Sequence, residues 1–250
     1  MQKEEHFRKR IQDLARMAYE RDIVTFTDFL DLNEQHIVNS LTRELAGVTH
    51  AGFGGYDMSE RQITAFIPDA LSYEWEYPIC CLHIRPRDGR FAETLTHRDY
   101  LGALLNLGID RNMLGDLLID ESSAYLYCVD HMSQFIIQEL TRVRRTAVTV
   151  VQSETMEPAV TRNFREIKGT VASVRLDALI ALAFQSSRNR MVPLIEGGKV
   201  FVNGRMVTSN GCALREGDVI SVRGHGKFRF AGVISETKKG RCLVSVSRYS

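Results

Sequence analysis

The order of apolar segments between residues 75 and 155 restricts the possible fold more than any other feature of this sequence. Four short runs have the apolar and β-branched composition of strands: 78–86 (PICCLHIRP), 116–119 (DLLI), 124–129 (AYLYCV) and 146–151 (TAVTVV). Caps and apolar stripes predict a helix after the first run and another after the third. The residues that indicate these helices are Thr96, Asp99 and Gly108 for the first, and Asp130, Phe135, Ile136, Leu140 and Val143 for the second. The order β-α-β-β-α-β is typical of a ferredoxin-like domain.

The flanking segments indicate two further units and an α+β fold class. Residues 1–20 have apolar side chains at three- and four-residue spacings, which predicts an amphipathic helix. A second helix is predicted from Asn33 to Gly47, followed by a glycine-rich loop and a strand at Ile63–Ile67. The expected domains are an α/β unit at 1–74, the ferredoxin-like (alpha-beta plait) domain at 75–155, a linker at 156–165 and a C-terminal α+β domain at 166–250.

Charge is distributed unevenly along the chain. The formal net charge is +1, but residues 166–250 contain 14 basic and 6 acidic residues, whereas residues 1–165 contain 18 basic and 25 acidic residues. A basic domain joined to an acidic body is the distribution expected of a protein that binds a polyanion such as nucleic acid.

Cysteine usage and hydropathy exclude several other classes. The five cysteines include no C-x-x-C pair, so the sequence predicts neither a structural zinc site nor a disulfide framework. His83, His97 and His131 also lack metal-ligand spacing. There is no apolar run of about 18 residues, and the charged N-terminus is unlike a secretory signal. We expect a cytoplasmic protein with no membrane contact, no metal and no cofactor.

The C-terminal segment has the pattern of two short helices followed by a small sheet. Ser173 is a candidate cap for the first helix and Ser186 or Ser187 for the second, which ends at Gly197-Gly198. Asn203-Gly204 lies between two short apolar runs and predicts a type I′ hairpin turn. Five cations remain at helix starts and strand ends, where they can bind phosphate together with helix N-terminal amides: Arg175, Arg188, Arg190, Lys199 and Arg205.

This pattern resembles the S4 RNA-binding domain, which is named for a ribosomal protein of the small subunit. The matching motifs are R-L-D at Arg175–Asp177, S-R at Ser187-Arg188, L-I at Leu194-Ile195, G-x-V-x-V-N-G at Gly198–Gly204 and G-D at Gly217-Asp218. The resemblance implies that the five cations face RNA. Pro193 departs from the pattern, because a proline inside the second helix removes a backbone hydrogen bond. A short or late-starting second helix is therefore expected.

The chain as a whole resembles the bacterial YlmH family. The segments that carry this resemblance are Phe26–Asp31 (FTDFLD), Gly52–Arg61 (GFGGYDMSER), His97–Ile119 (HRDYLGALLNLGIDRNMLGDLLI) and the S4 pattern. The resemblance implies a ribosome-associated RNA-binding protein that takes part in rescuing obstructed large subunits still carrying peptidyl-tRNA. The implied partners are structured RNA, both ribosomal RNA and tRNA, and a ribosomal subunit. We expect a monomer off the ribosome.

Several residues allow more than one interpretation. The Arg175–Asp177 triplet also occurs in pseudouridine synthases, where the aspartate is the nucleophile, but a helix-start carboxylate paired with arginine is the preferred interpretation. Gly52–Gly55 lacks a dinucleotide-binding spacing and is interpreted as a tight turn rather than a phosphate loop. Tyr125 and Tyr127 lie two apart on a predicted strand and share a face. There they could stack RNA bases or pack against a neighbouring domain.

The leading hypothesis is a non-catalytic RNA-binding protein that acts on the ribosome. The alternative is an RNA-modifying enzyme of the pseudouridine synthase or methyltransferase type, with an unrecognised site in residues 1–165. A methyltransferase would need a Rossmann-type cofactor loop, which the sequence lacks. A third hypothesis is a regulator that binds a protein partner through the acidic half.

Overall fold

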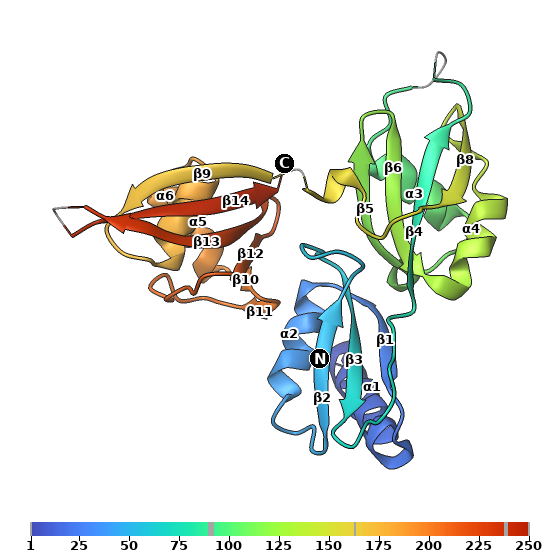
Figure 1. Ribbon diagram of the computed structural model, residues 1–250, viewed down its shortest axis with the longest axis horizontal. Coiled ribbons are helices and arrows are strands. Elements are labelled where there is room, and N and C mark those ends of the chain that lie inside the picture. Colours follow the sequence, from blue (N-terminus) through green and yellow to red (C-terminus); the bar gives the residue numbers. More distant parts are fainter. Residues whose placement is uncertain (1, 90–92, 163, 238–239, 250) are drawn as a thin grey trace. The chain divides into compact units, whose positions relative to one another are not determined.

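The computed structural model describes residues 2–89, 93–162, 164–237 and 240–249, and the chain divides into two compact units, residues 1–162 and 163–250 (Figure 1). The boundary falls inside the predicted linker, 156–165. Val160 is buried and lies in a 3-10 turn, Ala159–Arg162, that contacts the first unit, whereas Phe164 already belongs to a strand of the second. None of the described helices is long and apolar enough to cross a membrane.

Two helices and a three-stranded antiparallel sheet form the N-terminal part of the first unit. The elements are α1 (Gln2–Arg21), β1 (Thr25–Leu30), α2 (Leu32–Leu41), β2 (Val48–Phe53) and β3 (Gln62–Pro68), with strand order β1-β3-β2. Ile11, Leu41 and Phe66 are buried in the core between the helices and one sheet face. The Asp31 carboxylate caps α2 by accepting hydrogen bonds from the amides of Asn33 and Glu34.

The predictions of α1 and β3 are confirmed, but other predictions for this region need correction. β2 occupies residues that the sequence pattern predicts to be a glycine-rich loop, and β1 has no sequence prediction at all. α2 ends at Leu41 rather than at Gly47. Both missed strands are short edge strands that are ordered by pairing with the distant β3. A pairing between strands that are distant in sequence cannot be predicted from local composition.

Aromatic side chains cover the face of this sheet that is turned away from the helices. The Tyr77 ring centroid lies 5.9 Å from that of Phe26 and 5.3 Å from that of Phe53. The Tyr77 hydroxyl donates to the Ala51 carbonyl oxygen at 2.9 Å, and burial raises the pKa of Tyr77 to about 12. Trp75 packs on the same cluster, 5.0 Å from Tyr77. The segment with Trp75 and Tyr77, which leads to the next domain, therefore packs against this sheet.

The rest of the first unit is a ferredoxin-like domain, as predicted. Its elements are β4 (Ile79–Pro86), α3 (His97–Asn106), β5 (Leu114–Asp120), β6 (Ser123–Val129), α4 (Ser133–Glu139), β7 (Arg142–Val143) and β8 (Thr146–Gln152). The strand order is β5-β6-β4-β8-β7, and all paired strands are antiparallel. α3 and α4 pack on one face of the sheet (Figure 1). The core beneath them includes Leu82, Leu104 and Leu126. Among the described residues of this domain, no α-helix lies on the other face.

The two helix starts differ from each other. The predicted capping box of α3 is present, because the Thr96 amide donates to Asp99 Oδ2 at 2.8 Å. The prediction that Asp130 caps α4 is wrong. Asp130 begins a separate 3-10 turn, and its carboxylate accepts a hydrogen bond from the His131 amide. Val143 lies in β7 rather than on the helix, because α4 ends earlier.

One carboxylate connects the two parts of the first unit. Asp116 on β5 accepts hydrogen bonds from three donors in the turn between β2 and β3. Its Oδ2 accepts from the Tyr56 hydroxyl and the Glu60 amide, both at 2.7 Å, and its Oδ1 accepts from the Arg61 amide at 3.0 Å. Both carboxylate oxygens are therefore engaged by a turn from the neighbouring sheet.

The Arg61 guanidinium reinforces this connection. It donates to the Phe29 carbonyl oxygen of β1 at 2.7 Å and to the Leu114 carbonyl oxygen of β5 at 2.9 Å. Arg111 also donates to the Leu114 oxygen, at 2.6 Å. Burial, together with Arg61, lowers the pKa of Arg111 to about 10, so the Arg111 guanidinium stays charged at neutral pH. Burial also lowers the pKa of Arg61. The turn is thus bonded to both sheets.

The second unit is a six-stranded antiparallel sheet with two helices packed on it. Its elements are β9 (Phe164–Val171), α5 (Leu176–Ala183), α6 (Arg188–Glu196), β10 (Val200–Val202), β11 (Arg205–Met206), β12 (Val219–Val222), β13 (Gly226–Glu236) and β14 (Cys242–Tyr249). The strand order is β11-β10-β12-β13-β14-β9. Leu179 of α5, Ile195 of α6 and Val244 of β14 share one buried core.

Both predicted helices and the Asn-Gly hairpin of this unit are confirmed, but its sheet is larger than predicted. Ser173 does not cap α5, which begins at Leu176 with Arg175 in the cap position. β9, β13 and β14 are absent from the sequence prediction. They pair along their length, so β14 lies between β13 and a β9 strand that is distant in sequence.

The role of Asp116 gives a stability prediction. Asp116→Asn replaces one acceptor oxygen by an NH2 group and leaves a donor of the turn without an acceptor. We expect the free energy of unfolding of the first unit to fall by about 2 kcal/mol, measured by urea denaturation. Asp110→Asn is the matched control, because Asp110 is exposed and forms no side-chain cap. Equal stabilities of the two variants would contradict this role.

Candidate RNA-binding surfaces

The Asn203-Gly204 turn is structural and ties two of the sequence motifs together. Both residues have positive φ, 49° and 72°, as a type I′ turn requires. The Asn203 side chain donates to Asp218 Oδ1 at 2.8 Å and accepts from the Val219 amide at 2.9 Å. Asp218 Oδ2 accepts from the Arg215 amide at 2.7 Å. The N-G and G-D motifs therefore hold β10, β11 and β12 in place.

The start of α6 carries two exposed arginines. Arg188 and Arg190 are exposed in its first turn, and Ser187 occupies the cap position without a side-chain hydrogen bond. Across the described ranges no acidic side chain pairs with either arginine within 4 Å. Pro193 lies inside α6, yet the helix starts at Arg188. Of the two alternatives expected for this helix, the short helix is confirmed, since α6 has nine residues, and the late start is wrong, so both arginines sit at a helix N-terminus.

Lys199 and Arg205 lie on different parts of the sheet. Lys199 is exposed where the chain enters β10, and its carbonyl oxygen accepts from the Arg223 amide at 2.9 Å. The Arg223 guanidinium lies 5.5 Å from the centre of the Phe201 ring. The fold therefore places Arg223, which is not among the five predicted cations, beside Lys199. Arg205 is exposed on β11, an edge strand.

Arg175 is held in a local ion pair at the start of α5. Its Nε lies 3.3 Å from Oδ1 of Asp177, whose residue surface is only 7% exposed. The α5 amides of Leu176 and Asp177 donate to the carbonyl oxygens of Cys212 and Asn210. The expectation that this helix N-terminus offers free amides to phosphate is therefore wrong, because a loop of the same unit satisfies them. The eight residues of α5 span about 12 Å. Arg175 lies at the start of this helix, whereas the chain continues to Arg188 from its other end.

An aromatic and basic cluster beside the end of α5 was not predicted. The Arg248 guanidinium lies 4.9 Å from the centre of the Phe184 ring, and the His225 ring lies 5.9 Å from it. Arg248 lies on β14, Phe184 directly follows α5, and His225 lies in the turn between β12 and β13. Only the sheet pairing brings them together, so sequence spacing gives no signal for this cluster.

The two tyrosines of β6 have different environments. Tyr127 is 0% exposed, stacks on Tyr56 with ring centroids 5.1 Å apart, and donates a hydrogen bond to the Met156 carbonyl oxygen. Tyr127 cannot stack a base in this structure, so base stacking is wrong for this residue. The alternative expectation, packing against a neighbouring domain, is confirmed, because its ring packs against the turn from the neighbouring sheet. Tyr125 is half-buried and stacks on His83, with ring centroids 4.2 Å apart. Burial and nearby Arg85 lower the pKa of His83, which keeps its ring neutral at pH 7.

The glycine-rich segment is explained by packing rather than by phosphate binding. Gly52 lies in β2, and Gly55 has a φ of 100° with the Tyr127 ring against it. A side chain at Gly55 would overlap that ring, so the tight-turn interpretation fits the geometry.

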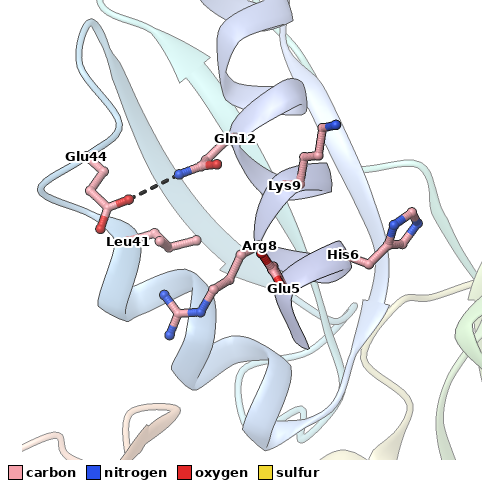
Figure 2. A pocket seen from close by; sticks show the side chains of 7 residues that line it. All are labelled: Glu5, His6, Arg8, Lys9, Gln12, Leu41 and Glu44. Carbon is pink, nitrogen blue, oxygen red and sulfur yellow. Dashed lines mark hydrogen bonds between the residues drawn. The ribbon is translucent and has the colours of Figure 1, made fainter. Parts of the chain in front are cut away.

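The part of the chain that the structure describes shows no arrangement typical of catalysis or metal binding. No group of three or more His, Cys, Asp or Glu side chains within it could hold a metal ion. A hollow of about 680 Å³ beside α1 is lined by charged side chains of that helix with Leu41 and Glu44 (Figure 2). The labelled His6 and Lys9 side chains point away from Glu44, which binds Gln12 at 3.1 Å (Figure 2). These groups do not converge on a common point.

Comparisons with known proteins identify two domains in this chain. Residues 73–157 match a family model described as "Putative RNA-binding domain in YlmH", and residues 174–220 match the model of the S4 domain. The Bacillus subtilis (strain 168) protein named Ribosome-associated protein quality control protein P2 is 31% identical over 255 residues, which span 98% of this chain and 97% of that protein. The solved structure of cell division protein ylmH from Streptococcus pneumoniae has a TM-score of 0.50 and 21% identity. The match covers 60% of this chain and 91% of the Streptococcus pneumoniae chain, and at this identity it is evidence for the fold alone.

The exposed cations give a prediction about salt dependence. We expect the variant with Arg188, Arg190 and Lys199 all replaced by alanine to bind structured RNA more weakly without unfolding, because exposed substitutions change stability by only about 0.5 kcal/mol. Removing one phosphate-binding cation should reduce the log–log salt slope by roughly 0.7–0.9. Binding across a salt series, with thermal melts as a folding check, measures both effects.

The matched control replaces Lys9, Arg21 and Arg43, three exposed cations of the first unit, by alanine. An unchanged slope in the first variant would assign phosphate binding to other cations, such as Arg223 or Arg248. Lys238 and Lys239 are further candidates in that case, and they lie outside the described residues.

Proposed function

This chain belongs to the YlmH family, and from that premise we propose that it is a non-catalytic RNA-binding protein that acts on the ribosome. We propose further that it binds ribosomal RNA and tRNA on the large subunit and serves in rescue or quality control of obstructed subunits. The observation that carries the proposal is the match, over nearly the whole chain, to a relative named for ribosome-associated quality control.

The C-terminal unit supports the proposal through its charge and its rigidity. The cations at the start of α6 are exposed and free of acidic partners within the described ranges, so they can neutralise phosphates. The turn between β10 and β11 is held by side-chain hydrogen bonds from Asn203 to the chain near Asp218, which keeps Lys199 and Arg205 on an ordered scaffold. Phosphate contacts of this kind position a protein on structured RNA.

The environment of Asp177 argues against catalysis by that residue. A nucleophilic aspartate must reach the base that it attacks. Asp177 is buried, pairs with Arg175 and lies at the first turn of α5. The described residues provide no observation that specifically favours the alternative, an RNA-modifying enzyme with its site in residues 1–165. We therefore propose a binding role for the first unit as well.

The proposal is tested by sedimentation with purified ribosomal subunits. We expect the protein to pellet with large subunits and not with small subunits at moderate salt, because the proposed binding site is on the large subunit. The triple variant of Arg188, Arg190 and Lys199 is the control, and it should remain in the supernatant. Equal binding to both subunits, or to neither, would contradict the proposal.

Catalysis is tested with Asp177→Asn in cells. We expect the nucleoside composition of ribosomal RNA and tRNA, measured by mass spectrometry, to be the same as in wild-type cells. A modified nucleoside that disappears in the variant would identify an enzyme.

A further inference from the structure

The ferredoxin-like sheet has one face without helices, and side-chain alternation defines which residues lie on it. Val148 and Val150 of β8 are buried in the core under the helices, so Ala147, Thr149 and Val151 face the opposite side. On β4, Leu82 and Ile84 are core residues, which places His83 and Arg85 on the opposite side. Strand pairing aligns Tyr125 of β6 with His83, and His83 with Val151 of β8.

One end of this face is closed and the other is open. The closed end holds Tyr127 and Cys81, both buried, where Tyr127 packs under Tyr56 of the turn between β2 and β3. At the open end Arg85, Ala147 and Thr149 are all exposed. The His83 and Tyr125 rings lie between the two ends, where they are half-buried and stacked at an interplanar angle of 10°.

The ring pair lies on the two central strands of the sheet. β4 and β6 are the first and third strands of the β-α-β-β-α-β order. Sheets of this fold that bind RNA use aromatic side chains on the sheet surface to stack unpaired bases. The His83 ring is held in place, because its Nε2 lies 3.1 Å from the Ser123 hydroxyl. A base that stacks on either ring would extend an aromatic stack that is already ordered, which lowers the entropy cost of binding.

The charge of the open end favours RNA over an apolar protein partner. Arg85 is exposed beside the ring pair, and Arg142 of β7 is exposed opposite Ala147. Among the described residues, neither arginine has an acidic side chain within 4 Å. The acidic group that faces the rings is Asp120, at the end of β5. The exposed Ala147 and Thr149 at the open end have small side chains, which leave room for a sugar-phosphate backbone.

We infer that the helix-free face of the ferredoxin-like sheet binds an unpaired RNA segment, with one base stacked on the His83–Tyr125 pair and phosphates beside Arg85 and Arg142. The inference rests on the proposed RNA-binding function and adds the class of RNA that the first unit takes. Single-stranded RNA is selected over duplex RNA, because a base inside a helix already stacks on its neighbours and cannot offer its face to a ring.

The test uses the full chain and an eight-nucleotide uridine RNA that contains one 2-aminopurine. Fluorescence anisotropy gives the affinity, and quenching of 2-aminopurine reports stacking. We expect Tyr125→Ala to weaken binding by about 5- to 150-fold and to abolish the quenching, since one base–aromatic stack has that value. Tyr125→Phe should retain both signals, and Tyr125→Leu, which keeps apolar bulk without a π face, should lose them. Duplex RNA of the same length should bind no better to wild type than to Tyr125→Ala.

The matched control is Phe135→Ala, an exposed aromatic (41%) on α4, which lies on the opposite side of the same domain. It should bind like wild type, and thermal melts exclude unfolding of either variant. Equal affinity of Tyr125→Ala, Tyr125→Phe and wild type for the oligonucleotide would overturn the inference. The inference would also be overturned if the wild-type chain did not bind the oligonucleotide but required Tyr125 to bind a protein of the large subunit.

Failure of this inference can be told apart from failure of the proposed function. If wild-type protein pellets with large subunits and the Tyr125 variants bind the oligonucleotide normally, the ribosomal function stands and the stacking site is wrong. If wild-type protein fails to bind subunits at all, the proposed function is wrong whatever the oligonucleotide does. If quenching still depended on Tyr125 in such a protein, the sheet face would bind single-stranded RNA, but it would have no role on the ribosome.

Discussion

The Asp116 carboxylate is the contact on which the arrangement of the first unit depends. It accepts three hydrogen bonds from the turn between β2 and β3, and Arg61 of that turn donates to backbone oxygens of β1 and β5. The same turn places Tyr56 against Tyr127. One anion on an edge strand therefore joins two sheets and closes one end of the helix-free face. The turn does not cover the other end, where Arg85, Ala147 and Thr149 are exposed.

This arrangement also marks the limit of what the sequence could predict. The order of apolar runs and the Thr96 capping box predict the ferredoxin-like fold, because those signals are local. The alternation of β6 correctly places Tyr125 and Tyr127 on one face, but it cannot show that a turn from another sheet covers only Tyr127. In the same way, pairing with distant strands orders β1, β2, β9 and β14. A local sequence pattern cannot predict which strand will be the partner.

The S4 pattern separates into scaffold residues and contact residues once the structure is considered. Asn203, Gly204 and Asp218 hold the hairpin, and Asp177 holds Arg175 while the neighbouring loop caps α5. The sequence predicted the candidate cations of α6, which remain exposed. It could not predict that Arg223 lies over Phe201 and Arg248 over Phe184, because those cation–aromatic pairs form only when the sheet is assembled. The motif therefore identifies exposed cations correctly, but it gives no sign of Arg223 and Arg248.

Under the proposed function, the two candidate surfaces would bind RNA through different physical forces. The α6 cations would act by charge, so their contribution would fall steeply as salt rises. The His83–Tyr125 pair would stack a neutral imidazole and a phenol ring on a base, an interaction that depends much less on salt. Because one chain carries both surfaces, binding at the first raises the effective concentration of the second on the same RNA. A ribosomal site that offers a phosphate-rich helix and an unpaired base within reach of each other would be bound far more tightly than a site that offers either alone. Selectivity for one ribosomal state can then arise without any base-specific hydrogen bond.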